Sequence, residues 1–228
     1  MTMARFKDLC IDAVEPLVLG PFWAAVLGRS WKPTDSGDGR IVGPTPGHTI
    51  WVNRVPEDKT VKLRVHFDVY AGSLDELRRL GSERARGWPD FPRWTVMADP
   101  EGGEYCAFLR DEVPEERLHG LVVDSADPAA QARWWAALLG GVVTDNPDGY
   151  STVAEVPGMP VRSMDFVPVG EPKLVKNRIH VDVVADGVLP IVDAGAKSVM
   201  TRGDDRRWDV LADPEGNEFC VFARGRDL

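Results

Sequence analysis

The feature that most constrains the fold of this chain is an internal repeat. Residues 177–222 align without a gap on residues 63–108, at an offset of 114 positions. Six pairs of chemically distinctive side chains coincide in this alignment: His66 with His180, Asp68 with Asp182, Trp94 with Trp208, Asp99 with Asp213, Glu104 with Glu218, and Cys106 with Cys220. Because chance does not produce such agreement, the chain is interpreted as a duplicated unit. The repeat predicts two domains of ordinary size, 1–112 and 117–228, joined by a charged linker.

The segment 178–183, with the sequence Arg-Ile-His-Val-Asp-Val, alternates between two kinds of side chain. Arg178, His180 and Asp182 point to one face, and three aliphatic side chains point to the other, which is the period of a β-strand. The last strand likewise presents a mixed face that includes Glu218 and Cys220. We therefore expect a sheet with helices behind it and a partly polar hollow in front.

Each half of the chain reads as two modules of one strand, one helix and two or three further strands. The four βαβββ-like modules fall at about 4–57, 62–110, 117–170 and 176–224. Asp127 and Ser73 are good helix N-caps, and Gly140 is a good C-terminal stop. Trp23 and Trp135 lie on apolar helices and are predicted to belong to the core. The fold class expected is α+β.

Composition excludes several classes of function. The net charge of −9 gives no electrostatic footprint for nucleic acid or for an anionic membrane surface. No stretch of the sequence has the length and apolarity of a membrane span or the pattern of a signal peptide. The three cysteines form no CxxC pair and no even-numbered framework, which indicates reduced thiols in the cytoplasm.

Three segments together resemble a known superfamily. They are the helix Arg-Trp-Trp-Ala-Ala-Leu-Leu-Gly at 133–140, the strand at 178–183, and Ala-Asp-Pro-Glu-Gly-Asn-Glu-Phe-Cys at 212–220. This combination is similar to the glyoxalase-like branch of the vicinal oxygen chelate superfamily, which also holds bleomycin-resistance proteins and extradiol dioxygenases. The resemblance covers nearly the whole chain twice. It implies two tandem domains, each of two paired βαβββ modules that form a cup-shaped mixed sheet around a small-molecule site.

The resemblance also implies where a divalent metal would bind. Enzymes of the superfamily take ligands from the first strand of each module and from an acid near the end of the last strand. In the C-terminal cup these positions hold His119, His180 and, in place of the acid, Cys220. The first-strand and acid positions of the N-terminal cup hold Lys7, His66 and Cys106. A third ligand in the C-terminal cup is then either Cys220, which favours zinc, or Glu218, which resembles an Fe(II) facial triad.

The remaining candidates each admit a structural and a functional interpretation. Glu218 and Glu104 are candidate general bases, or carboxylates paired with a neighbouring Arg. Trp94 and Trp208 stack on an aromatic ligand or pack on their own sheet. His180 binds a metal or hydrogen-bonds polar neighbours in the cavity wall. The predicted ligand-binding residues are Arg64, His66, Trp94, Glu104, Arg178, Asp182, Trp208 and Cys220; Glu218 is the catalytic candidate, and His119 and His180 are the metal candidates.

Two functions follow as expectations. The first is a protein that binds a small, partly aromatic organic molecule without a complete catalytic metal site, which the missing acid ligands favour. The second is a metal-dependent lyase, isomerase or dioxygenase that uses Fe, Zn, Ni or Mn in the C-terminal cup. Either would be a cytoplasmic monomer or homodimer without nucleic-acid or membrane partners.

Overall fold

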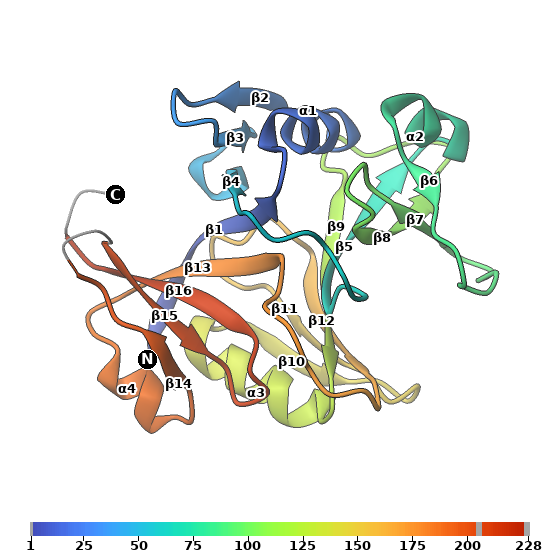
Figure 1. The fold of residues 1–228 in the computed structure, drawn as a ribbon. Coiled ribbons are helices and arrows are strands. Elements are labelled where there is room, and N and C mark those ends of the chain that lie inside the picture. The colour runs from blue at the N-terminus through green and yellow to red at the C-terminus, as the bar shows by residue number, and fades with distance from the viewer. Residues whose placement is uncertain (1, 204–206, 226–228) are drawn as a thin grey trace.

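The computed structural model of the chain describes residues 2–203 and 207–225, which form two eight-stranded mixed sheets (Figure 1). The first sheet has, in spatial order, β14 (Lys197–Met200), β15 (Trp208–Ala212), β16 (Glu218–Ala223), β13 (Ile179–Ala185), β1 (Ala4–Ala13), β4 (Ile50–Arg54), β3 (Gly39–Val42) and β2 (Ser30–Pro33). The second has β10 (Val142–Asp145), β11 (Ser151–Ala154), β12 (Ser163–Pro168), β9 (Leu118–Ser125), β5 (Val65–Ala71), β8 (Glu104–Leu109), β7 (Thr95–Ala98) and β6 (Glu83–Arg84). The expected α+β architecture of paired modules is confirmed.

The pairing of the modules differs from the expectation that neighbours in sequence share a cup. The first sheet combines the first module with the fourth, and the second sheet combines the second module with the third. At the centre of each sheet two first strands run antiparallel, β1 beside β13 and β5 beside β9. Each sheet therefore takes half of its strands from each repeat. The boundaries 1–112 and 117–228 describe the repeat, and their use as folding domains stays a prediction.

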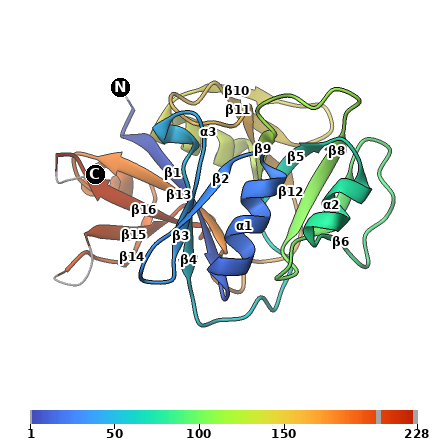
Figure 2. The same ribbon diagram turned by 90° about the horizontal axis from the view of Figure 1, so that it is seen from above.

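The helices tie the two sheets together. Helix α1 (Pro16–Val26) lies between the sheets (Figure 2) and packs on β3 and β4 of the first sheet. Its Trp23 is buried and meets Phe67 of β5 and Tyr105 of β8, edge to face, at centroid distances of 5.3 and 5.1 Å. Helix α3 (Pro128–Leu139) repeats this arrangement, because it packs on β11 and β12 while Trp135 meets Phe219 of β16. The predicted core role of both tryptophans is confirmed.

Local signals in the sequence explain where these helices begin and end. The Asp127 carboxylate accepts a hydrogen bond from Ala130 N at the start of α3, and Gly140 follows its end with a positive φ. Ser73 caps α2 (Leu74–Leu80) in the same way. The other two helical segments are short, η1 (Pro46–His48) and α4 (Leu189–Asp193). Among the residues described, no helix is long and apolar enough to cross a membrane.

The two Asp-Pro-Glu-Gly segments are turns, and the aspartate of each accepts a hydrogen bond from a tryptophan indole. Asp99 Oδ1 accepts hydrogen bonds from Glu101 N and Gly103 N, and Oδ2 accepts one from the Trp23 indole at 3.3 Å. Asp213 holds the Trp135 indole in the same way, at 3.1 Å. The turns thereby couple the helix of one module to the last hairpin of the next.

A close backbone approach between the first and third modules gives a test of this packing. A Cβ added at Gly47 would lie 2.4 Å from the carbonyl oxygen of Gly158. We expect Gly47→Ala to destabilise the protein by about 1–3 kcal/mol, because a backbone atom cannot yield as a side chain can. Gly170→Ala is the matched control, since no atom lies within 4 Å of its added Cβ. Urea unfolding measures both, and equal stability of the two variants would contradict the packing described.

Candidate functional site

The repeat places the same three polar side chains on neighbouring strands of each sheet. In the second sheet, His66 and Asp68 of β5 lie beside Cys106 of β8. The distance from His66 Nε2 to Cys106 Sγ is 3.6 Å, and that to Asp68 Oδ1 is 3.7 Å. In the first sheet the corresponding distances from His180 Nε2 are 3.6 Å to Cys220 Sγ and 3.5 Å to Asp182 Oδ1. Sequence analysis thus found members of both clusters.

The expected partnership of His119 and His180 is wrong. His119 lies on β9 of the second sheet, whereas His180 lies on β13 of the first. The two imidazoles cannot share an ion, because the modules that carry them do not share a sheet. His119 instead faces the same cavity as His66.

This second-sheet cavity has a volume of about 990 Å³ and one strongly aromatic wall. The Trp94 ring stacks on Phe91, with centroids 4.8 Å apart, and lies 5.7 Å from Phe108. His119 lies between Phe108 and Tyr70, at 5.4 and 4.5 Å. Of the predicted ligand-binding residues, His66, Trp94 and Glu104 line this cavity. Sequence analysis missed Phe91 and Phe108.

Four acidic residues line the cavity, Asp68, Glu104, Asp124 and Asp165, and two of them, Asp68 and Asp165, lie beside Gly120. Asp165 accepts hydrogen bonds from Thr152 Oγ1 at 2.7 Å and Ser163 Oγ at 2.9 Å. Asp68 is only 8% exposed, and its Oδ1 has no hydrogen-bond partner. A Cβ added at Gly120 would lie 3.6 Å from Asp165 Oδ2 and 3.6 Å from Asp68 Cβ, which is ordinary contact distance, so this glycine lies next to both side chains. Sequence analysis missed Asp165 because this residue lies outside both aligned segments of the repeat, 63–108 and 177–222.

Burial controls the protonation of this cluster. It raises the pKa of Asp68 to about 7, with the charge of Asp165 as a smaller cause. It lowers the pKa of His66 to about 4, with a contribution from Lys62, and it also lowers the pKa of His119. Both imidazoles are therefore neutral at pH 7 and able to accept a proton or a metal ion.

The cysteines are not activated nucleophiles, although the structure does bring an imidazole beside each. Burial, and next the charge of Asp68, raises the pKa of the Cys106 thiol. The thiol and the carboxylate also approach the same imidazole nitrogen, Nε2 of His66. A general base needs one ring nitrogen for the nucleophile and the other for its orienting partner. This arrangement disfavours thiolate catalysis in the absence of a metal.

The Glu104 and Glu218 carboxylates bind the segments that connect one module to the next, which we call the linkers, at about 57–63 and 171–177. Glu104 accepts hydrogen bonds from Lys59 Nζ and Leu63 N, both at 3.0 Å. Glu218 accepts from Lys173 Nζ at 2.7 Å and Asn177 N at 3.1 Å. Both oxygens of each carboxylate are thus committed, and the ion-pair partner is a lysine where an arginine was expected. These contacts favour a structural role over catalysis for Glu218.

Arg64 and Arg178 also serve the linkers. Arg64 donates to the carbonyl oxygens of Glu171 and Asp124, and Arg178 donates to the carbonyl oxygen of Glu57 and to the Glu101 carboxylate. Both arginines line a separate cavity of about 690 Å³ between the linkers. Arg64 and Arg178 were predicted to bind a ligand inside the cups. Because they line a different cavity, their position does not support this prediction.

On the first sheet, the side chains near His180 make close contacts with one another. Trp208 stacks on Phe222 at 5.5 Å, and the Lys7 ammonium lies 4.5 Å from the centre of the Phe222 ring. Lys7 also forms an ion pair with Asp8, which accepts a hydrogen bond from the Trp51 indole at 3.2 Å. Trp208 therefore packs on Phe222 of its own sheet, as the structural interpretation of this residue expected. Its repeat mate Trp94 lines a cavity.

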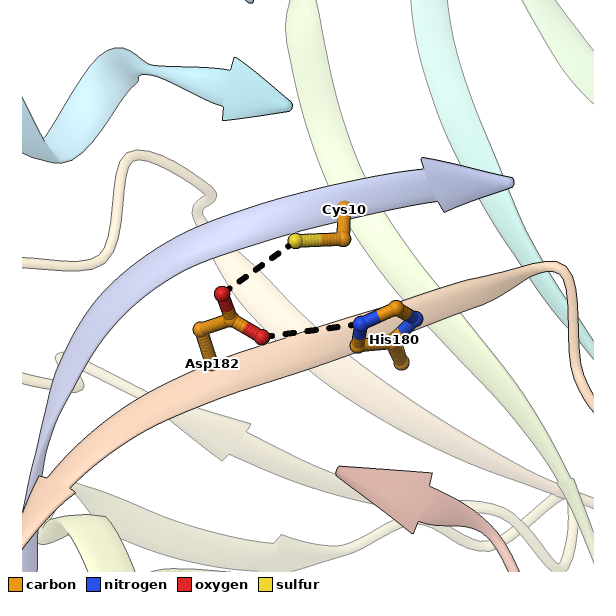
Figure 3. Close-up of side chains that lie close together, drawn as sticks. All are labelled: Cys10, His180 and Asp182. Atoms are coloured by element: carbon orange, nitrogen blue, oxygen red, sulfur yellow. Dashed lines mark hydrogen bonds and ion pairs between the residues drawn. The ribbon is translucent and has the colours of Figure 1, made fainter. Parts of the chain in front are cut away.

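The first sheet adds a fourth group, Cys10 of β1, to its cluster (Figure 3). Its thiol donates to Asp182 Oδ2 at 3.3 Å, and Cys10 is the strand partner of His180. Burial raises the pKa values of Cys10 and Asp182. Cys10 was missed because it has no mate in the repeat. Alternation along β1, with Asp8 and Asp12 on the same face, was the signal that could have found it.

Both clusters contain donor atoms suited to a divalent metal. Ligand atoms of His66, Asp68 and Cys106 lie within 4.8 Å of one another, as do those of Cys10, His180 and Asp182. Each set offers an imidazole, a carboxylate and a thiol, and the Oδ1 atoms of both aspartates lack hydrogen-bond partners. By donor chemistry, the residues fit the kind of ion that the resemblance implies.

Two mixed sheets of paired βαβββ modules, each with a cluster of imidazole, carboxylate and thiol, have the architecture of a glyoxalase-type protein. The profile of the glyoxalase-like domain matches residues 8–108 and 120–222, and the chain belongs to this family of the vicinal oxygen chelate superfamily. A search of curated protein sequences gives no significant match.

Similar solved structures share the fold over almost the whole chain. Glyoxalase I from Zea mays is 12% identical, with a TM-score of 0.69, over 96% of this chain and 92% of that one. A putative dioxygenase from Bacillus subtilis is 13% identical, with a TM-score of 0.64, over 99% and 86%. The cppA protein from Streptococcus pneumoniae is 10% identical, with a TM-score of 0.51, over 98% and 100%. At these identities the likeness shows the fold alone.

The raised pKa of Asp68 predicts a pH dependence of stability. Between about pH 4 and pH 7 the unfolded chain has released this proton and the folded protein still holds it, so the free energy of unfolding falls as pH rises through this window. Asp68→Asn removes this contribution. We expect the variant to gain on the order of 2 kcal/mol relative to wild type between pH 4 and pH 8.

Urea unfolding in chelator-containing buffer at several pH values measures this difference. Asp148→Asn, at an exposed position, is the control and should follow wild type throughout. Parallel pH profiles for wild type and Asp68→Asn would show that Asp68 is not a buried acid with a raised pKa.

Proposed function

We propose that this protein binds a small, partly aromatic organic molecule in the second-sheet cavity. The observation that carries the proposal is the combination of a cavity of about 990 Å³ with stacked aromatic rings on its wall and a buried, unpartnered carboxylate oxygen in its lining. Ligand sites have this size and are mostly apolar, with a few polar groups that orient the ligand. The equivalent side chains of the first sheet make close contacts with one another, with Trp208 on Phe222 and Lys7 beside Phe222 and Asp8.

The polar groups of the cavity define how a ligand would be oriented. Neutral His66 and His119 can each donate or accept one hydrogen bond, and Asp68 Oδ1 accepts or, when protonated, donates. The Trp94 face offers a stacking surface for an aromatic ring. A planar ring carrying hydroxyl, carbonyl or amine groups at one end satisfies both regions.

The assignment of compartment and assembly belongs to the same proposal. A cytoplasmic location accords with three free cysteines, and a net charge of −9 disfavours nucleic-acid partners. The second-sheet cavity is built within one chain, so a monomer is sufficient for binding and a homodimer is compatible with it.

One observation favours a second function, a metal-dependent lyase, isomerase or dioxygenase. The donor atoms of His66, Asp68 and Cys106 are close together, and all three residues line the cavity. A divalent ion held there would polarise adjacent oxygen atoms of a substrate. Three protein ligands leave a coordination position for that substrate. The sequence predicted the metal site of such an enzyme in the C-terminal cup. The structure favours the second sheet for this second function, because the donor atoms there line the cavity.

Binding of naphthalen-2-ol, compared with its saturated counterpart decahydronaphthalen-2-ol, tests the proposal. We expect the aromatic probe to bind more tightly and Trp94→Ala to weaken its binding by about tenfold, because the variant removes the stacking face. Trp208→Ala, the repeat mate in the first sheet, is the matched control and should leave the affinity unchanged. Isothermal titration calorimetry gives the affinities. If Trp208→Ala abolished binding and Trp94→Ala kept it, the site would lie in the first sheet and the proposal would be contradicted.

A further inference from the structure

Two arginines lie at one edge of the second-sheet cavity. Arg93 is two residues before the start of β7 and Arg110 directly follows β8, and these antiparallel strands pair Thr95 with Ala107. The start of β7 and the end of β8 therefore meet at the same edge of the sheet. Both arginines line the cavity. This edge thus presents two cationic side chains to a ligand, although the whole chain has a net charge of −9.

Each of these guanidinium groups lies near an aromatic ring. That of Arg93 is 5.9 Å from the centre of the Trp94 ring, and that of Arg110 is 4.7 Å from the centre of the Tyr70 ring. Arg110 also donates a hydrogen bond to the carbonyl oxygen of Leu109 at 2.9 Å. The attraction between a cation and an aromatic face positions a guanidinium, which has five N–H donors in all. Both groups therefore keep donors for an acceptor in the cavity.

The arginine edge and the polar cluster lie on one face of β8. Alternate side chains of a strand share a face, so Cys106, Phe108 and Arg110 follow one another along the cavity. Arg110 continues the ladder, because its N–H donates to the carbonyl oxygen of Ala71. At about 3.3 Å per residue, Cys106 and Arg110 are about 13 Å apart along the strand. A molecule of one or two rings with a polar group at each end can span much of this distance.

The repeat shows that the arginine edge lacks a counter-ion. Arg224, the repeat mate of Arg110, forms an ion pair with Asp186 at 3.0 Å. The position equivalent to Asp186 is Gly72, which has no carboxylate. Within the part of the chain that the structure describes, neither Arg93 nor Arg110 forms an ion pair. The second sheet thus has unneutralised cations beside a cavity, where the first sheet neutralises the equivalent of Arg110.

We propose that Arg93 and Arg110 select an aromatic carboxylate as the ligand of the second-sheet cavity. This selection presupposes the binding function proposed above and names the chemical class of the ligand. A carboxylate accepts hydrogen bonds from guanidinium groups, and such charge-assisted bonds are about twice as strong as neutral ones. The ring would lie along Trp94, with a polar group at its other end directed to the cluster of His66. The four acidic residues of the lining disfavour a dianion such as a phosphate ester.

Binding of three naphthalene probes tests this selection. The anion 6-hydroxynaphthalene-2-carboxylate and the matching carboxamide have the same size and differ in charge, whereas naphthalen-2-ol has neither group. By isothermal titration calorimetry at neutral pH and low salt, we expect the carboxylate to bind about tenfold more tightly than the carboxamide. A high salt concentration should reduce this preference, because screening weakens the attraction between partly exposed charges.

Substitutions of the arginines locate the preference. Arg93→Gln and Arg110→Gln should each lower it by at least about threefold and change the affinity for the neutral carboxamide by less than about twofold. Arg224→Gln, the same change at the repeat mate in the first sheet, is the matched control and should retain the preference.

The outcomes separate this selection from the binding function itself. If wild type bound the carboxylate and the carboxamide equally while Trp94→Ala still weakened naphthalen-2-ol binding, the selection would be overturned and the binding function would stand. A preference that persisted in the double variant of Arg93→Gln and Arg110→Gln would also overturn the selection. Failure of all three probes to bind would overturn both proposals.

Discussion

The structure depends on the antiparallel pairing of first strands from different halves of the chain. β1 pairs with β13 and β5 pairs with β9, and these pairs form the centre of the two sheets. The pairing decides which side chains share a hollow, because only modules in one sheet can bring their polar faces together. The helices then stabilise the arrangement from behind, since Trp23 and Trp135 each pack on the sheet to which their own module does not contribute strands.

Duplication supplied two equivalent clusters, and a few side chains have made their surroundings different. The same imidazole, carboxylate and thiol occur in both. In the second sheet, stacked aromatic rings border a cavity. In the first sheet, Asp8 instead pairs with Lys7 and accepts a hydrogen bond from the Trp51 indole, and Cys10 joins the cluster through its bond to Asp182. The two equivalent clusters therefore differ in their surroundings: a cavity adjoins the cluster of the second sheet, and Cys10 joins the cluster of the first.

Much of this architecture was predictable from the sequence. Periodicity gave the strands, capping residues gave the helix ends, and the repeat located the His, Asp and Cys clusters. The pairing of modules was not predictable, because the strand around His66 and the strand around His180 have nearly the same pattern and β1 could pair with either. Cys10 escaped notice because it has no repeat mate. The cavity could not be foreseen because it depends on Phe91 and Phe108, whose apolar character is equally consistent with packing.

The crossed pairing has a consequence for the origin and assembly of such chains. A single half would carry a first module and its neighbour with the central edges of β1 and β5 unpaired, and exposed edges recruit another strand. Because the second and fourth modules are repeat mates, the first module of one copy could pair with the second module of another. Two separate halves would then assemble into the same pair of sheets through exchange between subunits. The segment 110–117 converts that intermolecular association into an intramolecular one, which removes its dependence on protein concentration.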